Sequence, residues 1–273
     1  MIVSLENINK LIGINIEQKQ AIELLERMLY KVKKKGKEKL EIFIPAYRTD
    51  VLHEVDVADD LSRAYGFSNI VERFPRISTI GSLKNISFVQ DNIINTMTSL
   101  GFQEVMLLTL SSKKEMIDNF EIDDKEVIKL GYSKDKTLDV IVSWQTPKLL
   151  KFLTNNQHMF YPQKIFSCNN VVVKEEKEET LSKTKLSLAT MIANSKVSFS
   201  EMSSVLLGLC NTLGWRVSLE EKEYPFYIKK RSAKIIINDK EVGHIGELSP
   251  KVLKAFEYYM PVCSFEIDVE KIN

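Results

Sequence analysis

The chain has 273 residues, which is long enough for a large core and predicts two domains rather than one. Hydrophobic residues make up 44% of it and charged residues 27%, which excludes disordered, collagen-like and low-complexity proteins. The 38 Lys and Arg nearly balance the 37 Asp and Glu, so the net charge of +1 excludes the basic surface of a stand-alone nucleic-acid binder.

The first 75 residues predict a small helix and strand domain. Glu17–Leu29 carries apolar residues at helical spacing, and a short strand from Leu40 ends at Pro45. Between them, six lysines in residues 31–39 indicate a solvated basic turn, with phosphate contact as the alternative. Val51–Tyr65 then predicts an amphipathic helix that ends at Gly66.

Residues 72–76 are polar and broken by a proline, so the seam between domains is expected near residue 75. From residue 76 to residue 273, helices and strands alternate irregularly. Helices are predicted at 88–99, 147–153 and 199–213, and strands at 103–110, 138–143, 164–166, 171–173, 232–237, 242–248 and 262–269. Strands 164–166 and 171–173 are expected to pair, the charged run 174–185 to form a hairpin turn or loop, and Gly243 and Gly246 to allow a tight strand-to-turn passage. The fold class is therefore α+β, with a small first domain and a mainly antiparallel sheet in the second.

The cysteines and the apolar segments limit where the protein works. Cys168, Cys210 and Cys263 lie far apart without a CxxC pair, which argues against a disulfide framework and a structural zinc site. The apolar stretches are far shorter than the ~20 residues that cross a bilayer, and the amino terminus lacks a signal-peptide pattern. We expect a soluble, cytoplasmic protein with reduced thiols.

Four aspartates in and before the helix at 51–65 are the most informative cluster. Asp56, Asp59 and Asp60 share one helical face, and Asp50 precedes them. Like charges at this spacing repel, so a counter-charge is expected. Mg²⁺, which prefers oxygen ligands, is one candidate. The other is arginine, supplied by Arg48 and Arg63, with Asp50 capping the helix and a pairing network that runs from Asp56 to Arg63. Spacing leaves both interpretations open.

The residue motifs of this segment resemble those of a known family. Pro45–Asp50 reads P-x-Y-R-x-D, Asp56–Asp60 reads D-x-x-[ED]-[ED], and Arg63–Ile70 reads R-x-Y-G-[YF]-x-N-I. Together they resemble the magnesium-carrying domain of the phenylalanyl-tRNA synthetase β subunit in its archaeal and eukaryotic form. By this resemblance, the Mg²⁺ ligands are Asp50, Asp56, Asp59 and Asp60.

The resemblance continues in residues 100–112 and 231–268 and is weakest over 115–198. It implies that residues 76–273 form a class II aminoacyl-tRNA synthetase-like module without catalytic activity. In the family this module packs against an α subunit, which holds phenylalanine, ATP and the reactive end of tRNA, and αβ heterodimers pair into a heterotetramer. The chain would correspond to the carboxy-terminal half of a β subunit and would meet tRNA through the complex. We find no class II glycine-rich segment that ends in arginine, so no ligase activity is expected of the chain alone.

Two other functions are considered. The family's I-F-E-I-G strand appears here as Ile165–Asn169, a departure that also fits a diverged, truncated paralogue acting as a binding or regulatory module. An independent class II ligase would have to exchange pyrophosphate into ATP by itself, which we do not expect.

Overall fold

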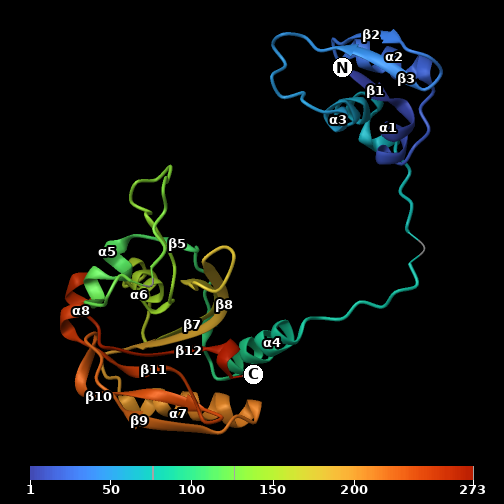
Figure 1. The fold of residues 1–273 in the computed structure, drawn as a ribbon. Coiled ribbons are helices and arrows are strands. Elements are labelled where there is room, and N and C mark those ends of the chain that lie inside the picture. The colour runs from blue at the N-terminus through green and yellow to red at the C-terminus, as the bar shows by residue number, and fades with distance from the viewer. Residues whose placement is uncertain (76, 126, 273) are drawn as a thin grey trace. The chain divides into compact units, whose positions relative to one another are not determined.

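The computed structural model describes residues 1–75, 77–125 and 127–272, which fold into two compact units, Met1–Ile80 and Gly81–Asn273 (Figure 1). The division lies a little beyond the predicted seam at residue 75. Arg76 and Asn273, the two ends of the predicted second domain, lie outside the described residues. No helix in the described part of the chain has the length and apolar character needed to span a membrane.

Unit 1 packs helices against a three-stranded antiparallel sheet with the strand order β1-β3-β2. Its elements are β1 (Ile2–Ser4), α1 (Leu5–Ile12), α2 (Gln18–Arg27), β2 (Lys31–Lys34), β3 (Lys39–Phe43), α3 (Glu54–Tyr65) and the 3-10 turn η1 (Phe67–Asn69). The core combines buried side chains from each layer, among them Leu25 of α2, Ile42 of β3 and Leu61 of α3. The predicted helices at 17–29 and 51–65 are thus confirmed, although both are shorter than expected.

The lysine run is a strand where a turn was predicted. Lys31–Lys34 pairs antiparallel with β3 and leaves only the following residues to make the turn. The strand lies at the edge of the sheet, where lysine side chains reach solvent and oppose pairing with another chain. A lysine-rich edge strand has little apolar alternation, and for that reason its pattern resembles a loop.

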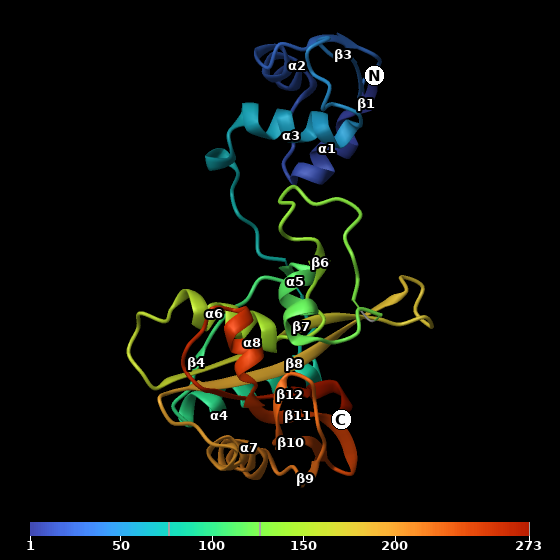
Figure 2. The same cartoon turned by 90° about the vertical axis from the view of Figure 1, so that its left-hand side faces the viewer.

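Unit 2 is built on a seven-stranded sheet with the order β4-β7-β8-β12-β11-β10-β9, antiparallel except for the β4 and β7 pair. Its elements are α4 (Asn85–Ser99), β4 (Gln103–Glu104), β5 (Leu110–Ser111), α5 (Lys113–Met116), η2 (Asp118–Phe120), β6 (Val140–Ile141), α6 (Thr146–Asn155), β7 (Gln163–Lys174), β8 (Ser182–Ala193), α7 (Phe199–Leu213), β9 (Val217–Glu221), β10 (Tyr227–Ile237), β11 (Lys240–Leu248), α8 (Pro250–Ala255), β12 (Val262–Asp268) and η3 (Val269–Lys271). In Figure 2, α4 and α7 lie along one face of this sheet, and α5, α6 and α8 lie on the other. Each face has its own apolar cluster.

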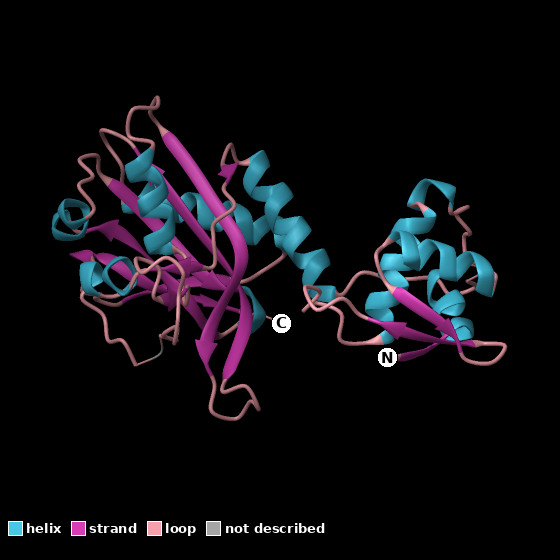
Figure 3. Ribbon diagram, turned by 90° about the horizontal axis from the view of Figure 1, so that it is seen from above, coloured by secondary structure: helices cyan, strands magenta, loops and turns pink. Residues whose placement is uncertain are grey.

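Three strand predictions in unit 2 are corrected. Residues 164–166 and 171–173 do not pair with each other but belong to one long strand, β7, which forms a hairpin with β8 (Figure 3). The predicted strand at 103–110 forms only at its ends, since Met106 is 91% exposed and Leu108 is 75% exposed. Gly243 lies inside β11 rather than before a turn. A Cβ at this position would come within 1.9 Å of the Glu266 backbone oxygen on β12, which explains why the residue is glycine.

Candidate functional site

Helix α3 places three of the four predicted aspartates on unit 1. One side of the helix is buried through Val57, Ala58 and Leu61, whose exposed fractions are 0%, 2% and 0%. The helix ends before Gly66, which has a φ of +93° and donates its N–H to the last turn. Asp56 and Asp59 therefore lie on the remaining faces of a helix that the core holds in a fixed rotation, whereas Asp60 lies on its buried side.

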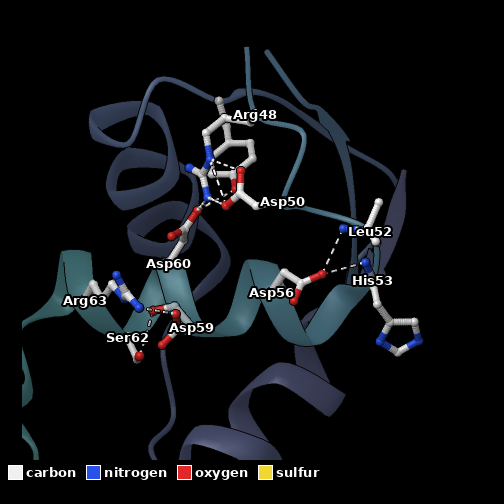
Figure 4. Close-up of polar contacts among 10 residues, drawn as sticks. Arg48, Asp50, Leu52, His53, Asp56, Asp59, Asp60, Ser62 and Arg63 are labelled. Atoms are coloured by element: carbon white, nitrogen blue, oxygen red, sulfur yellow. Dashed lines mark hydrogen bonds and ion pairs between the residues drawn. The ribbon is translucent and has the colours of Figure 1, made fainter. Parts of the chain in front are cut away.

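Asp56 caps the start of α3. Its Oδ2 accepts the backbone N–H groups of Leu52 and His53, both at 2.8 Å (Figure 4). These two hydrogen bonds, that of His53 first, lower the pKa of Asp56 below its ordinary value. The helix thus begins at Glu54 with His53 as N-cap, and the predicted role of Asp50 as cap is wrong. Within the predicted pairing network from Asp56 to Arg63, Asp56 binds these backbone groups instead of the arginine.

Asp59 pairs with Arg63 one turn further along the helix. The carboxylate and guanidinium groups are 2.8 Å apart, and their side chains are 52% and 60% exposed. An ion pair this exposed is screened by water and salt and stabilises little.

Asp60 is the one aspartate of the four that is buried, with 5% of its surface exposed. Its carboxylate accepts the Tyr30 hydroxyl at 2.5 Å and lies 2.7 Å from the Arg48 guanidinium. Burial and this hydrogen bond raise the pKa of Tyr30, so the phenol stays protonated and donates. The guanidinium also lies over the Tyr30 ring, 5.6 Å from its centroid.

Asp50 joins the same network from the loop before α3. Arg48 donates to it through Nε at 2.9 Å and through its terminal nitrogen at 2.8 Å. This contact lowers the pKa of Asp50, and the hydrogen bonds to Asp50 and then to Asp60 raise that of Arg48. Arg48 therefore bridges two carboxylates, one exposed on the loop and one buried on the helix, as Figure 4 shows.

The four carboxylates do not converge on one point. Asp50 and Asp60 meet through Arg48, whereas Asp56 and Asp59 have separate partners. No group of three or more His, Cys, Asp or Glu side chains in the described ranges is placed to hold a metal ion. Mg²⁺ requires oxygen ligands at about 2.0 to 2.1 Å. The Arg48 guanidinium occupies the space between the Asp50 and Asp60 carboxylates. In this arrangement the four aspartates do not fit a shared Mg²⁺. Arginine is the counter-charge of three of them, because Arg48 pairs with Asp50 and Asp60 and Arg63 pairs with Asp59.

Sequence reasoning missed Tyr30, the partner that makes the burial of Asp60 possible. It lies 30 residues before Asp60 in the chain, between α2 and β2, so helical spacing could not associate the two. The available signal was general: a buried carboxylate needs both a cation and a further donor, and a tyrosine between a helix and a strand can supply one.

Comparisons with known proteins cover nearly the whole chain. Residues 1–67 match the tRNA synthetase B5 domain, and residues 70–269 match the phenylalanyl tRNA synthetase beta chain CLM domain. The phenylalanine–tRNA ligase beta subunit of Pyrococcus furiosus is 34% identical over 97% of this chain and 48% of that protein. That of Methanocella arvoryzae is 33% identical over 99% of this chain and 50% of that protein. The chain thus spans about half the length of the curated relatives it matches.

A solved structure supports the fold assignment. The pyrrolysyl tRNA synthetase PylSc of Desulfitobacterium hafniense matches with a TM-score of 0.56, at 13% identity, over 69% of this chain and 67% of that one. At this identity the likeness concerns the fold alone, and it agrees with the predicted synthetase-like module. With family models matching on both sides of residue 68, the chain belongs to the phenylalanyl-tRNA synthetase β chain family.

Proposed function

We propose that this chain is a non-catalytic part of a phenylalanine–tRNA ligase β subunit, which supports ATP-dependent attachment of phenylalanine to tRNA by an α subunit. The observation that carries the proposal is the family match across both units. The α subunit, a heterotetramer and tRNA contact through the complex belong to the same proposal.

The distribution of arginine supports an accessory role. Activation of an amino acid with ATP needs cations directed at the triphosphate. Unit 2 contains only Arg216 and Arg231. Arg216 is paired with Asp239 on the surface, and Arg231 donates to Glu247 at 2.6 Å. Both guanidinium groups therefore have carboxylate partners of their own.

Co-expression with the α subunit of a phenylalanine–tRNA ligase from the same organism tests this proposal. We expect the two chains to co-elute in size-exclusion chromatography, and we expect the β chain alone to give no exchange of pyrophosphate into ATP. Exchange by the chain alone would identify an independent ligase. Failure to bind α under conditions where both chains are folded would favour the diverged binding or regulatory module.

Mg²⁺ binding by Asp50, Asp56, Asp59 and Asp60 stays a separate prediction, and it requires Arg48 to release Asp50 and Asp60. If the carboxylates bind the ion, Arg48→Ala should tighten Mg²⁺ binding in a calorimetric titration, because a competing cation is removed. Replacing Asp59 and Asp60 together by alanine should abolish the binding heat. Equal heats from all three proteins would remove these aspartates from the ligand set.

A further inference from the structure

Large apolar side chains lie exposed in the segment between η1 and α4. Each of them is between 69% and 99% exposed, and they are Val71, Phe74, Ile77, Ile80 and Leu83. Residues 71–75 and 77–84, where the structure describes this segment, form no helix or strand (Figure 1). Single apolar residues on a surface need no explanation, but a concentration of this kind marks an interaction site. We refer to these five side chains as the apolar strip.

The members of the strip follow one another at intervals of three residues. In a β-strand this spacing would send successive members to opposite faces, and in an α-helix it would spread them around the axis. A polyproline II helix has three residues per turn, so there all five side chains would lie along one edge, about 37 Å long. Pro75, within the segment, has a φ that suits this conformation. The spacing therefore predicts a polyproline II helix when the strip is bound.

Neither folded core of the chain accounts for the strip. None of its five members belongs to an apolar cluster of the described residues. The spacing of three continues into α4 with Ile86 and Val89, and these two side chains do pack against the core of unit 2. The pattern thus leaves the core where α4 begins, and the strip offers the same kind of side chain to another surface.

The charges of the segment indicate what that surface contains. Arg73, Arg76 and Lys84 outnumber the single acidic residue, Glu72. A partner groove with apolar walls and carboxylates along its edge complements both the strip and these cations. Two copies of the strip would not complement each other, because their cations would be brought together.

We propose that the apolar strip docks as a polyproline II helix into an apolar groove with acidic edges on the α subunit. This inference rests on the proposed function, because it takes the α subunit as the partner. It adds the segment of the chain that makes the contact and the chemistry of the groove that receives it. No member of the strip is needed for the fold of either unit.

The affinity for the α subunit tests the strip directly. We expect Phe74→Ser combined with Ile80→Ser to weaken binding of α at least about tenfold in a calorimetric titration, because two apolar side chains are lost from the contact. Ser78→Ala combined with Ser82→Ala is the matched control, since both serines are exposed in the same segment and lie off the strip. It should leave the affinity unchanged. Urea unfolding of each variant should match that of the parent chain.

An exchange of two neighbours tests the spacing. Thr79→Ile combined with Ile80→Thr keeps the composition of the segment and moves one apolar side chain out of the period of three. We expect this variant to lose most of the affinity that Ile80→Ser loses alone. Binding as tight as that of the parent chain would show that apolar content and not spacing matters, and would overturn the polyproline II conformation.

Thiol reactivity in the complex locates the contact. The three native cysteines are buried, and burial raises the pKa of each thiol, so they react slowly. A cysteine introduced by Ile80→Cys is therefore the reactive thiol of the free chain. We expect α to slow its alkylation at least about tenfold, and to slow that of Ser78→Cys less. Equal rates for Ile80→Cys with and without α would place the strip outside the interface.

The remaining outcomes separate this inference from the proposed function. Full affinity in the Phe74→Ser, Ile80→Ser variant would overturn the strip as the docking segment and leave the chain a partner of α. A folded parent chain that does not bind α would overturn both. A dimer of the parent chain in sedimentation that this variant abolishes would identify a second copy as the occupant, and strip-dependent binding to anionic lipid vesicles would identify a membrane surface. Either result would overturn the proposal.

Discussion

Asp60 in unit 1 and Glu266 in unit 2 are both buried carboxylates, but their negative charges are satisfied in opposite ways. Asp60 faces a cation, Arg48, and a phenol, Tyr30, which come from two other segments. Among the residues that the structure describes, Glu266 has only neutral donors, two of them backbone N–H groups at the start of α6. The first network depends on a long side chain that a competing cation could displace. The second is part of the backbone arrangement and fastens α6 to β12.

The largest expected effect therefore comes from the neutral network. Glu266→Ala leaves four donors without an acceptor in a buried site, and we expect the free energy of unfolding of unit 2 to fall by about 4 kcal/mol. Both tryptophans lie in unit 2, so tryptophan fluorescence during urea unfolding measures this unit alone.

Glu266→Gln is the matched control for that measurement. It keeps the length of the side chain and one acceptor oxygen, but directs an NH₂ group at a donor, so the loss should be smaller and still substantial. A loss under about 1 kcal/mol in the alanine variant would show that water replaces the carboxylate and that the donors do not depend on it.

In unit 1, the corresponding change is Asp60→Ala, which removes the common partner of Arg48 and Tyr30. We expect a loss of about 2 to 3 kcal/mol, less than in unit 2, because the Arg48 side chain is 21% exposed and water can take over part of its solvation. Unit 1 has no tryptophan, so hydrogen exchange of α3 peptides, read by mass spectrometry, is the suitable measurement. Protection as high as in the parent chain would mean that the ionic network contributes nothing net.

The Asp56 cap makes the stability of α3 depend on pH. Its folded pKa is lowered by the backbone N–H groups of His53 and Leu52, so its contribution is present above the unfolded value, about 3.9, and is lost as pH falls through the folded value. We expect the protection of α3 to decline below about pH 4, and Asp56→Ala to show less of that decline. Asp56→Asn keeps an acceptor oxygen and should retain part of the cap at neutral pH. An unchanged acid profile in Asp56→Ala would attribute the decline to other carboxylates.

The sequence predicted the elements of both units better than it predicted the site. Helices such as α3 and α7 were recognisable because apolar spacing and a terminal glycine act locally. The arrangement around Asp60 could not be recognised from the sequence, because tertiary packing that no local pattern encodes brings Tyr30, Arg48 and α3 together. Arg48 and Arg63 were correctly named as possible counter-charges, but which aspartate each one meets depends on the rotation of α3 and on the path of the loop before it. The cavity of unit 2 that Ser187, His244 and Glu266 line was not anticipated for the same reason, since its walls come from β7, β8, β11 and β12 and from loops far apart in the sequence.

The smallest effect is expected at an exposed ion pair on α3. Asp59 and Arg63 have ideal helical spacing, yet both side chains are more than half exposed, so Asp59→Ala should cost only about 0.3 to 0.5 kcal/mol, and less at high salt. Hydrogen exchange of α3 at low and at high ionic strength measures this difference, with Asp60→Ala as the reference. If the two alanine variants lost equal protection, burial would not separate the two aspartates. The contrast between exposed pairs and buried networks would then fail within a single helix.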